Sequence, residues 1–238
     1  MNETPVPSRM TGPLKLSVVI PVYNEVRTIR AVLEKVAGIP LDKEIVCVDD
    51  GSSDGTSALL DELASDTIRV VHHPRNRGKG AALRTALAHV SGDIVIVQDA
   101  DLEYDPANYP ALIAPIVEGR TTVVYGTRFH AGNDMGYSKY KIAARALTWL
   151  TNILFGARIT DEATCYKVFR ADVIRAIPLR CERFEFCPEV TAKVLKRGID
   201  IQEVPIDYAP RTVAEGKKIS WRDGFEAFYY LVKYRFVD

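Results

Sequence analysis

The sequence predicts an α/β fold with a doubly wound, mostly parallel sheet and helices toward its C-terminal end. Short apolar runs rich in β-branched residues occur at 16–22, 44–48, 68–71 and 93–97, and helical patterns separate them. This order of strand, helix and strand is that of crossover connections between parallel strands. Acidic residues closely follow three of the strands, and such sheets bind ligands at the carboxyl ends of their strands. We therefore expect the functional site at that edge.

The composition is that of an ordinary globular protein. The 238 residues are 47% hydrophobic and 26% charged, and 31 basic residues balance 31 acidic ones. Because there is no overall basic field, we expect no nucleic-acid partner. No signal peptide and no apolar run of about 18 residues is visible, which favours a cytoplasmic protein. The cysteines lack CxxC spacing and are expected to be reduced packing residues, namely Cys47, Cys165, Cys181 and Cys187.

The N-terminal region predicts a tail, a strand and a helix. Residues 1–14 are polar and contain proline, so we expect a flexible tail before a single domain at 15–238. After the strand at 16–22, apolar residues recur every three or four positions, which is typical of a helix. Asn24 is the expected N-cap of this helix, and Gly38 begins its stop signal.

The second strand ends in two acids, Asp49 and Asp50. Two glycines and several small hydroxyl residues follow at 51–56, and they allow the backbone to approach a ligand closely. Ser53 or Asp54 can cap the next helix.

A basic, glycine-containing segment, Asn-Arg-Gly-Lys-Gly at 76–80, opens the helix after the third strand. It is not a P-loop, because it lacks the upstream glycine and a Ser or Thr after the lysine. Nor is it a G-x-G-x-x-G motif, because position 83 is Leu. Lys79 and the amide groups at the helix start can nevertheless contact an anion.

The fourth strand, at 93–97, is followed by Asp99, Asp101 and Glu103. Alternate side chains of an extended chain point the same way, so these carboxylates can converge. Clustered carboxylates suit Mg²⁺ or Mn²⁺, which share their oxygen ligands with substrate phosphates. Solvated acids that merely end a strand are the alternative.

The rest of the chain alternates less regularly. We expect strands at 121–125, 165–169 and 201–206, and helices at 106–118, 138–155, 189–196 and 221–236.

Two of these helices carry conspicuous apolar residues. The helix at 138–155 has a stripe that includes Ile142, Trp149 and Ile153, and the helix at 221–236 is aromatic. Core packing is the first explanation for both, and an amphipathic membrane-surface segment is the second.

Three motifs occur in order along the chain: Val-Ile-Pro-Val-Tyr-Asn-Glu at 19–25, Val-Asp-Asp-Gly-Ser-Ser-Asp-Gly-Thr at 48–56 and Asp-Ala-Asp at 99–101. With them, the chain resembles the family-2 inverting glycosyltransferases of the GT-A fold. Within that family it resembles the polyprenyl-phosphate sugar synthases, the dolichyl-phosphate mannose and glucose synthase group. The resemblance extends from residue 15 to the C-terminus.

The resemblance implies a pocket for a nucleotide-diphosphate sugar. Asp50 would contact the base, and Arg211 and Lys217 would close over the diphosphate. Asp101 and Glu103, with Asp99 beside them, would bind a divalent metal, Mg or Mn. The expected donor-binding residues are Pro21, Tyr23, Glu25, Asp50, Lys79, Asp99, Ala100, Asp101, Arg211 and Lys217.

The resemblance also implies an acceptor site, in which Arg128 and Arg145 would hold a phosphate. The chain departs from the synthases at 160–165, where their Pro and Gly are absent, and in the basic loop at 211–218, where the glycine is displaced and a Ser is missing. The residues expected to be catalytic are Asp99, Asp101, Asp161 and Arg211.

The implied activity is transfer of a hexose from GDP-mannose, UDP-glucose or UDP-N-acetylglucosamine to a polyprenyl phosphate of the dolichyl type. Such an enzyme would be peripheral on the cytosolic face of a membrane, attached by its own helices or by an integral-membrane partner. A homo-oligomer is a further expected partner state. Two alternatives stay open: a glycosyltransferase with a soluble or saccharide alcohol acceptor, for which Asp161 or Glu162 would be the base, and a non-catalytic nucleotide-sugar-binding module.

Overall fold

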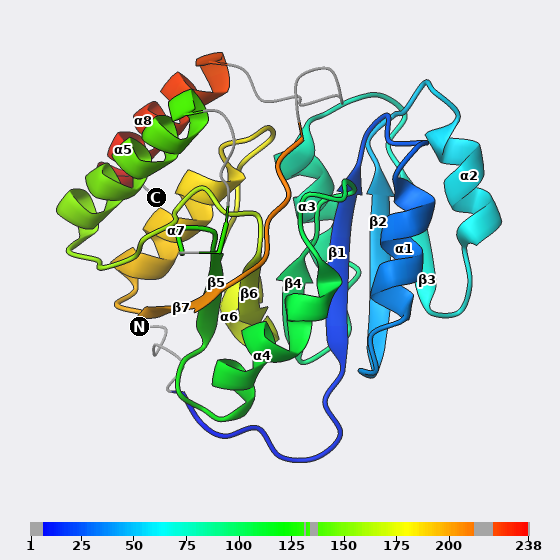
Figure 1. Cartoon of the computed structure of the whole chain (residues 1–238), viewed down its shortest axis with the longest axis horizontal. Coiled ribbons are helices and arrows are strands. Elements are labelled where there is room, and N and C mark those ends of the chain that lie inside the picture. Colours follow the sequence, from blue (N-terminus) through cyan, green and yellow to red (C-terminus); the bar gives the residue numbers. More distant parts are fainter. Residues whose placement is uncertain (1–6, 131, 134–137, 212–220, 238) are drawn as a thin grey trace.

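The computed structural model describes residues 7–130, 132–133, 138–211 and 221–237, which form a seven-stranded sheet with helices on both faces (Figure 1). The strand order is β3-β2-β1-β4-β6-β5-β7. Only β6 runs antiparallel to its neighbours, β4 and β5, so the predicted mostly parallel, doubly wound α/β sheet is confirmed. The strands are β1 (Leu16–Val22), β2 (Lys43–Asp49), β3 (Ile68–His72), β4 (Ile94–Val97), β5 (Val123–Thr127), β6 (Lys167–Arg170) and β7 (Ile201–Pro205).

The helices follow the predicted order with two differences. The helix expected at 106–118 begins as a short 3₁₀ turn, and a five-residue helix after β6 had no clear pattern in the sequence. The helices are α1 (Ile29–Ala37), α2 (Thr56–Leu63), α3 (Lys79–Leu87), η1 (Pro106–Asn108), α4 (Tyr109–Val117), α5 (Ser138–Phe155), α6 (Ala171–Arg175), α7 (Phe186–Lys196) and α8 (Trp221–Phe236).

The strand register brings the acidic motifs to one edge of the sheet. Val22 at the end of β1 pairs with Asp49 at the end of β2, and Val19 pairs with Val97 at the end of β4. The residues that follow these three adjacent strands therefore emerge side by side. This is the arrangement that the sequence predicts for the functional edge.

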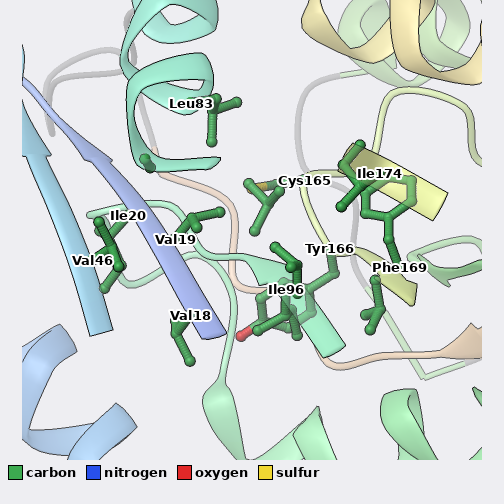
Figure 2. Close-up of a cluster of buried hydrophobic side chains, with 14 of the residues drawn as sticks. Val18, Val19, Ile20, Val46, Leu83, Ile96, Cys165, Tyr166, Phe169 and Ile174 are labelled. Atoms are coloured by element: carbon green, nitrogen blue, oxygen red, sulfur yellow. The ribbon is translucent and has the colours of Figure 1, made fainter. Parts of the chain in front are cut away.

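The core beneath this edge joins the sheet to the helices. Figure 2 shows one cluster of buried side chains from β1, β2, β4, α3 and the segment around β6. At the end of β4, the buried Gln98 accepts hydrogen bonds of 2.7 Å from both Tyr109 and Tyr166. Because every side chain in this group is packed or hydrogen-bonded, the backbone that carries Asp99 is fixed.

One local prediction near the N-terminus is wrong. Asn24 does not cap α1: it has a φ of 50°, and its side chain accepts a hydrogen bond from the Ser53 amide, so α1 starts later. Of the tail expected at 1–14, residues 1–6 lie outside the described residues; in the described part, the Met10 amide donates a hydrogen bond to the Val117 carbonyl at 3.0 Å. The backbone around Arg9 lies so close to Gly119 that a Cβ there would clash.

The prediction that the apolar stripe of α5 packs in the core is also wrong. Ile142, Trp149 and Ile153 are 67%, 65% and 58% exposed, whereas Leu147 and Thr151 face inward. Helix α8 lies beside α5 and likewise exposes Phe225, Tyr229 and Phe236 while it buries Leu231 and Tyr234 (Figure 1). In the described part of the chain, the helices are too short or too polar to cross a bilayer.

Candidate active site

A cavity of about 930 Å³ opens at the carboxyl edge of β1, β2 and β4 and continues beneath α5 and α8. It contains nearly all of the residues that the sequence singles out. Those that line it are Pro21, Tyr23, Glu25, Asp50, Lys79, Asp99, Ala100, Asp101, Glu103, Arg128 and Arg211.

The first charged group in the cavity is the Lys79–Asp99 ion pair. Lys79, the first residue of α3, donates a short hydrogen bond to the Asp99 carboxylate. Burial disfavours charge on both groups, but their mutual attraction prevails: it raises the pKa of Lys79 and lowers that of Asp99. A lysine ammonium group is thereby fixed at the edge where a phosphate can approach it.

The second group centres on Arg211. Its guanidinium group lies 2.7 Å from Asp101 and 3.3 Å from Glu25. Burial, together with the charges of Asp99 and Glu103, raises the pKa of Asp101 to about 7, although Arg211 opposes this shift. The cluster thus holds more negative charge than Arg211 neutralises.

Glu103 connects this cluster to the segment after β7. One of its carboxylate oxygens accepts the Arg211 amide at 2.7 Å, and the other accepts the Tyr208 hydroxyl at 3.0 Å. Tyr208 also stacks near Arg128, whose guanidinium carbon lies 5.1 Å from the ring centroid. Tyr208 is a site residue that the sequence analysis missed, because a single tyrosine after a strand gives no signal.

A divalent cation fits the excess negative charge around Asp101 and Glu103. Across the described ranges, no three carboxylate, imidazole or thiol groups lie close enough to hold a metal by themselves, so the expected set of Asp99, Asp101 and Glu103 stays a prediction. Asp99 is paired with Lys79. Two carboxylates would leave the other ligand positions to water and phosphate oxygens, which is the usual arrangement for Mg²⁺.

Asp50 has a structural task in addition to its place in the cavity wall. Its carboxylate accepts hydrogen bonds from the amides of Arg77 and Gly78, at 2.9 and 2.7 Å, and lies 2.7 Å from the His73 ring. Gly78 has a φ of 96°, and a Cβ at this position would lie 2.3 Å from the Glu182 carbonyl oxygen. Asp50 and Gly78 together hold the segment 75–78 against the cavity.

This segment brings Arg75 and Arg77 to the cavity wall, which the sequence analysis did not anticipate.

Asp161 is locked in an ion pair and is unsuited to act as a base. Its oxygens accept two hydrogen bonds from the Arg128 guanidinium group, at 2.7 and 2.8 Å, and a third from the Arg128 amide. Asp161 is fully buried and Arg128 is 9% exposed. The expected catalytic role of Asp161 stays a prediction, and the structure shows its carboxylate held by Arg128.

The two arginines expected to hold an acceptor phosphate do not converge on the cavity. Arg128 lines it, whereas Arg145 is exposed on α5 and stacks on Phe129, with 5.2 Å between its guanidinium carbon and the ring centroid. Lys141, one turn earlier on α5, lines the cavity instead. Lys217 lies outside the described residues.

The far end of the cavity, beneath α5 and α8, is mainly apolar. Leu147 of α5, Phe186 of α7 and Phe228 of α8 contribute to its wall. The cavity therefore has a charged end at the sheet and an apolar end at the helices.

Comparisons with known proteins agree with this architecture. Residues 17–177 match the model of the Glycosyl transferase family 2 domain. Undecaprenyl-phosphate 4-deoxy-4-formamido-L-arabinose transferases from Enterobacter sp. (strain 638) and Erwinia tasmaniensis are 32% and 35% identical over 211 residues. The matches cover 85% of this chain and 62% of each relative, so the chain spans less than two thirds of the relatives' length.

Solved structures show the same fold at lower sequence identity. Glucosyl-3-phosphoglycerate synthase from Mycobacterium tuberculosis, crystallised with Mn²⁺, UDP and phosphoglyceric acid, superposes with a TM-score of 0.73 at 22% identity, covering 94% of this chain and 80% of that one. Mannosyl-3-phosphoglycerate synthase from Rubrobacter xylanophilus gives 0.71 at 20% identity, covering 93% and 72%. The fold is the GT-A fold, and the chain belongs to glycosyl transferase family 2.

Proposed function

We propose that this chain is a metal-dependent inverting glycosyltransferase that moves a sugar from a nucleotide-diphosphate donor to a polyprenyl phosphate. The observation that carries the proposal is the charged end of the cavity, where Lys79 and Arg211 flank Asp99 and Asp101. Family membership and the names of the relatives support it.

The positive charges of Lys79 and Arg211 support the donor half of the reaction. A departing nucleoside diphosphate accumulates negative charge, and Lys79 and Arg211 are placed to stabilise it. A divalent ion on Asp101 and Glu103 would supply further charge neutralisation when bound. Attack from the opposite side of the sugar then inverts the anomeric centre.

The acceptor half needs little from the protein beyond positioning. A phosphate monoester has a second pKa near 6 and is largely ionised at neutral pH, so it attacks without a general base. This requirement suits a site in which Asp161 is locked on Arg128. Arg128 and Lys141 would face the phosphate, and the apolar wall around Leu147 and Phe228 would face the first isoprene units.

The exposed side chains of α5 and α8 supply a surface for the membrane that holds such a lipid. Ile142, Trp149, Ile153, Phe225 and Phe236 lie on these two neighbouring helices and are 58% to 78% exposed. Monomeric soluble proteins seldom expose apolar residues so densely, whereas peripheral proteins bury them at the lipid boundary. We place this face on the cytosolic leaflet, at the apolar end of the cavity.

The test is transfer from a panel of labelled nucleotide sugars to short polyprenyl phosphates in the presence of Mn²⁺. The panel contains GDP-mannose, UDP-glucose, UDP-N-acetylglucosamine and the UDP derivative of 4-deoxy-4-formamido-L-arabinose, the sugar named for the relatives. We expect Mn²⁺-dependent label in the organic phase with one donor. Hydrolysis or binding of a donor without a lipid product would leave the nucleotide pocket in place and overturn the lipid acceptor.

A further inference from the structure

Tyr208 lies between the two charged groups on which the proposed reaction depends. It follows β7 and lines the cavity together with Glu103 and Arg128. Its hydroxyl donates a hydrogen bond of 3.0 Å to the Glu103 carboxylate, and its ring centroid lies 5.1 Å from the guanidinium carbon of Arg128. One side chain therefore contacts a residue of the proposed cation site and a residue of the proposed acceptor site.

The Tyr208 backbone is anchored to the acidic segment that follows β4. Tyr208 forms a single antiparallel bridge with Tyr104, and the two rings are 5.2 Å apart. The next amide, that of Ala209, donates to the Glu103 carbonyl oxygen at 2.9 Å. The Tyr208 amide donates to the Asn133 side chain at 3.2 Å. The ring is therefore placed by contacts within the folded chain, before any ligand binds.

The Tyr208 hydroxyl fixes one side of the Glu103 carboxylate. One oxygen of Glu103 accepts this hydroxyl, and the other accepts the Arg211 amide at 2.7 Å. A carboxylate has about four lone-pair positions, so two hydrogen bonds orient it without exhausting its capacity to hold a cation. The outer partners of a metal ligand set its orientation, and their removal weakens metal binding by about 10- to 100-fold. Loss of the hydroxyl should therefore weaken a cation site that includes Glu103.

The Tyr208 ring lies against the guanidinium group of Arg128. Asp161 accepts hydrogen bonds from Nε and Nη2 of Arg128, at 2.7 and 2.8 Å, which fixes one edge of this group. An aromatic ring attracts a guanidinium group that lies over its face, and the attraction is stronger where water is excluded. Arg128 is 9% exposed, so the ring and Asp161 together hold its charge at the cavity wall.

We propose that Tyr208 is a positioning residue for both halves of the proposed reaction: its hydroxyl orients Glu103 toward a divalent cation, and its ring orients Arg128 toward the acceptor phosphate. This inference rests on the proposed function, from which it takes both sites. The two tasks depend on different parts of one side chain. Substitutions that remove the hydroxyl alone, or the hydroxyl and the ring together, can therefore separate them.

Nucleotide binding at a series of Mn²⁺ concentrations tests the hydroxyl. UDP and GDP are titrated calorimetrically into wild type, Tyr208→Phe and Tyr208→Leu. Both variants lack the hydroxyl, so we expect them to need about tenfold more Mn²⁺ than wild type for the same strengthening of nucleotide binding. Binding of the nucleotide without metal should stay close to that of wild type. Tyr229→Phe, which removes the hydroxyl of a tyrosine that is 62% exposed on α8, is the control and should match wild type.

Transfer kinetics at saturating Mn²⁺ test the ring. Tyr208→Phe keeps the ring, so its kcat and its KM for the polyprenyl phosphate should approach those of wild type once Mn²⁺ is saturating. Tyr208→Leu lacks the ring, so its KM for the polyprenyl phosphate should be about fivefold higher at the same Mn²⁺ concentration. A purely structural role would produce neither the recovery at high Mn²⁺ nor the difference in KM between the two variants.

Thermal unfolding of the free protein completes the test. Tyr208 is half-buried, and Tyr208→Phe should unfold close to the wild-type temperature. An equal Mn²⁺ requirement in wild type and Tyr208→Phe, or an equal acceptor KM in the two Tyr208 variants, would overturn the inference and leave the proposed function intact. A clearly lower unfolding temperature of Tyr208→Phe, with parallel loss of metal-free nucleotide binding, would also overturn it in favour of a structural role. A wild type that does not respond to Mn²⁺, or that transfers no sugar to a polyprenyl phosphate, would overturn the proposed function and this inference together.

Discussion

Two carboxylates at opposite ends of the sheet, Glu44 and Asp101, have pKa values that are shifted in opposite directions. At the amino end, Glu44 of β2 accepts hydrogen bonds from Ser17, Ser91, Gly92 and Lys15. Burial raises the pKa of Glu44, but the hydrogen bonds from Ser17, Ser91 and Lys15 outweigh it and lower the pKa to about 2. At the carboxyl end, burial and like charges raise the pKa of Asp101 to about 7. The first carboxylate is saturated by the protein and stabilises the fold. The second is left under-neutralised where a ligand enters, which is typical of a functional site.

The substitution Asp101→Asn tests this difference between the two ends of the sheet most strongly. Removing this charge should lower sugar transfer by about a thousandfold, because the leaving diphosphate loses its cation site. The unfolding free energy should be unchanged or raised, since a buried carboxylate among like charges is costly. Transfer kinetics and urea unfolding measure the two effects. The exposed Asp66→Asn, in the loop between α2 and β3, serves as control, and a large loss of stability in Asp101→Asn would contradict the contrast.

Asp161→Asn tests a carboxylate that lies near the site but is saturated like Glu44. It would leave the buried Arg128 without its bidentate partner, so we expect a loss of about 3 kcal/mol in unfolding free energy, with a parallel loss of activity. Asp172→Asn breaks the Arg170–Asp172 pair, whose carboxylate is 56% exposed, and should cost less than about 1 kcal/mol. Full stability with loss of turnover alone in Asp161→Asn would restore Asp161 as a candidate base.

Glu44→Gln tests the saturated end directly. We expect it to lower the unfolding free energy at pH 7 by about 2 kcal/mol while turnover per folded molecule is unchanged. The folded pKa of about 2 lies below the ordinary value of 4.5, so the contribution of the Glu44 charge is present above pH 4.5 and is lost as the pH falls toward 2. Urea titrations at pH 7 and pH 2.5 should therefore show the difference from wild type shrinking. If the difference in unfolding free energy between Glu44→Gln and wild type did not depend on pH, the loss of stability would come from the shape of the side chain and not from its charge.

The smallest effect on stability is expected on the outer face of α5. Replacing Trp149 and Ile153 by Ser removes exposed side chains only, so the unfolding free energy should change by less than about 0.5 kcal/mol. Flotation on anionic vesicles should nevertheless fall several-fold. Ala146→Ser on the same helix is the matched control. Unchanged flotation of the double variant would remove α5 from the proposed membrane face.

Much of the fold could be predicted because it depends on local patterns. The bounds of β1, α5 and α8 agree with their apolar periodicity, and the acids at the ends of β2 and β4 mark the functional edge. The start of α1 was missed because Asn24 adopts a positive φ that no pattern encodes. The exposed stripe of α5 was misread because periodicity identifies a face of a helix but not what covers it.

The site was predicted less completely, because its partners are distant in sequence. Arg211 and Asp101 are 110 residues apart, and Arg128 and Asp161 are 33 apart. Motifs identified both acids, but only the packing of the chain decides which one is saturated by a buried arginine and which one remains under-neutralised.

The most direct test of the central claim is nucleotide binding with and without Mn²⁺, measured by calorimetry with UDP and GDP on wild type and Asp101→Asn. If the under-neutralised carboxyl end of the sheet is the donor site, Mn²⁺ should strengthen binding of one nucleotide to wild type by at least about tenfold and have little effect on Asp101→Asn. Equal binding by the two proteins, with no effect of Mn²⁺ on either, would contradict the account.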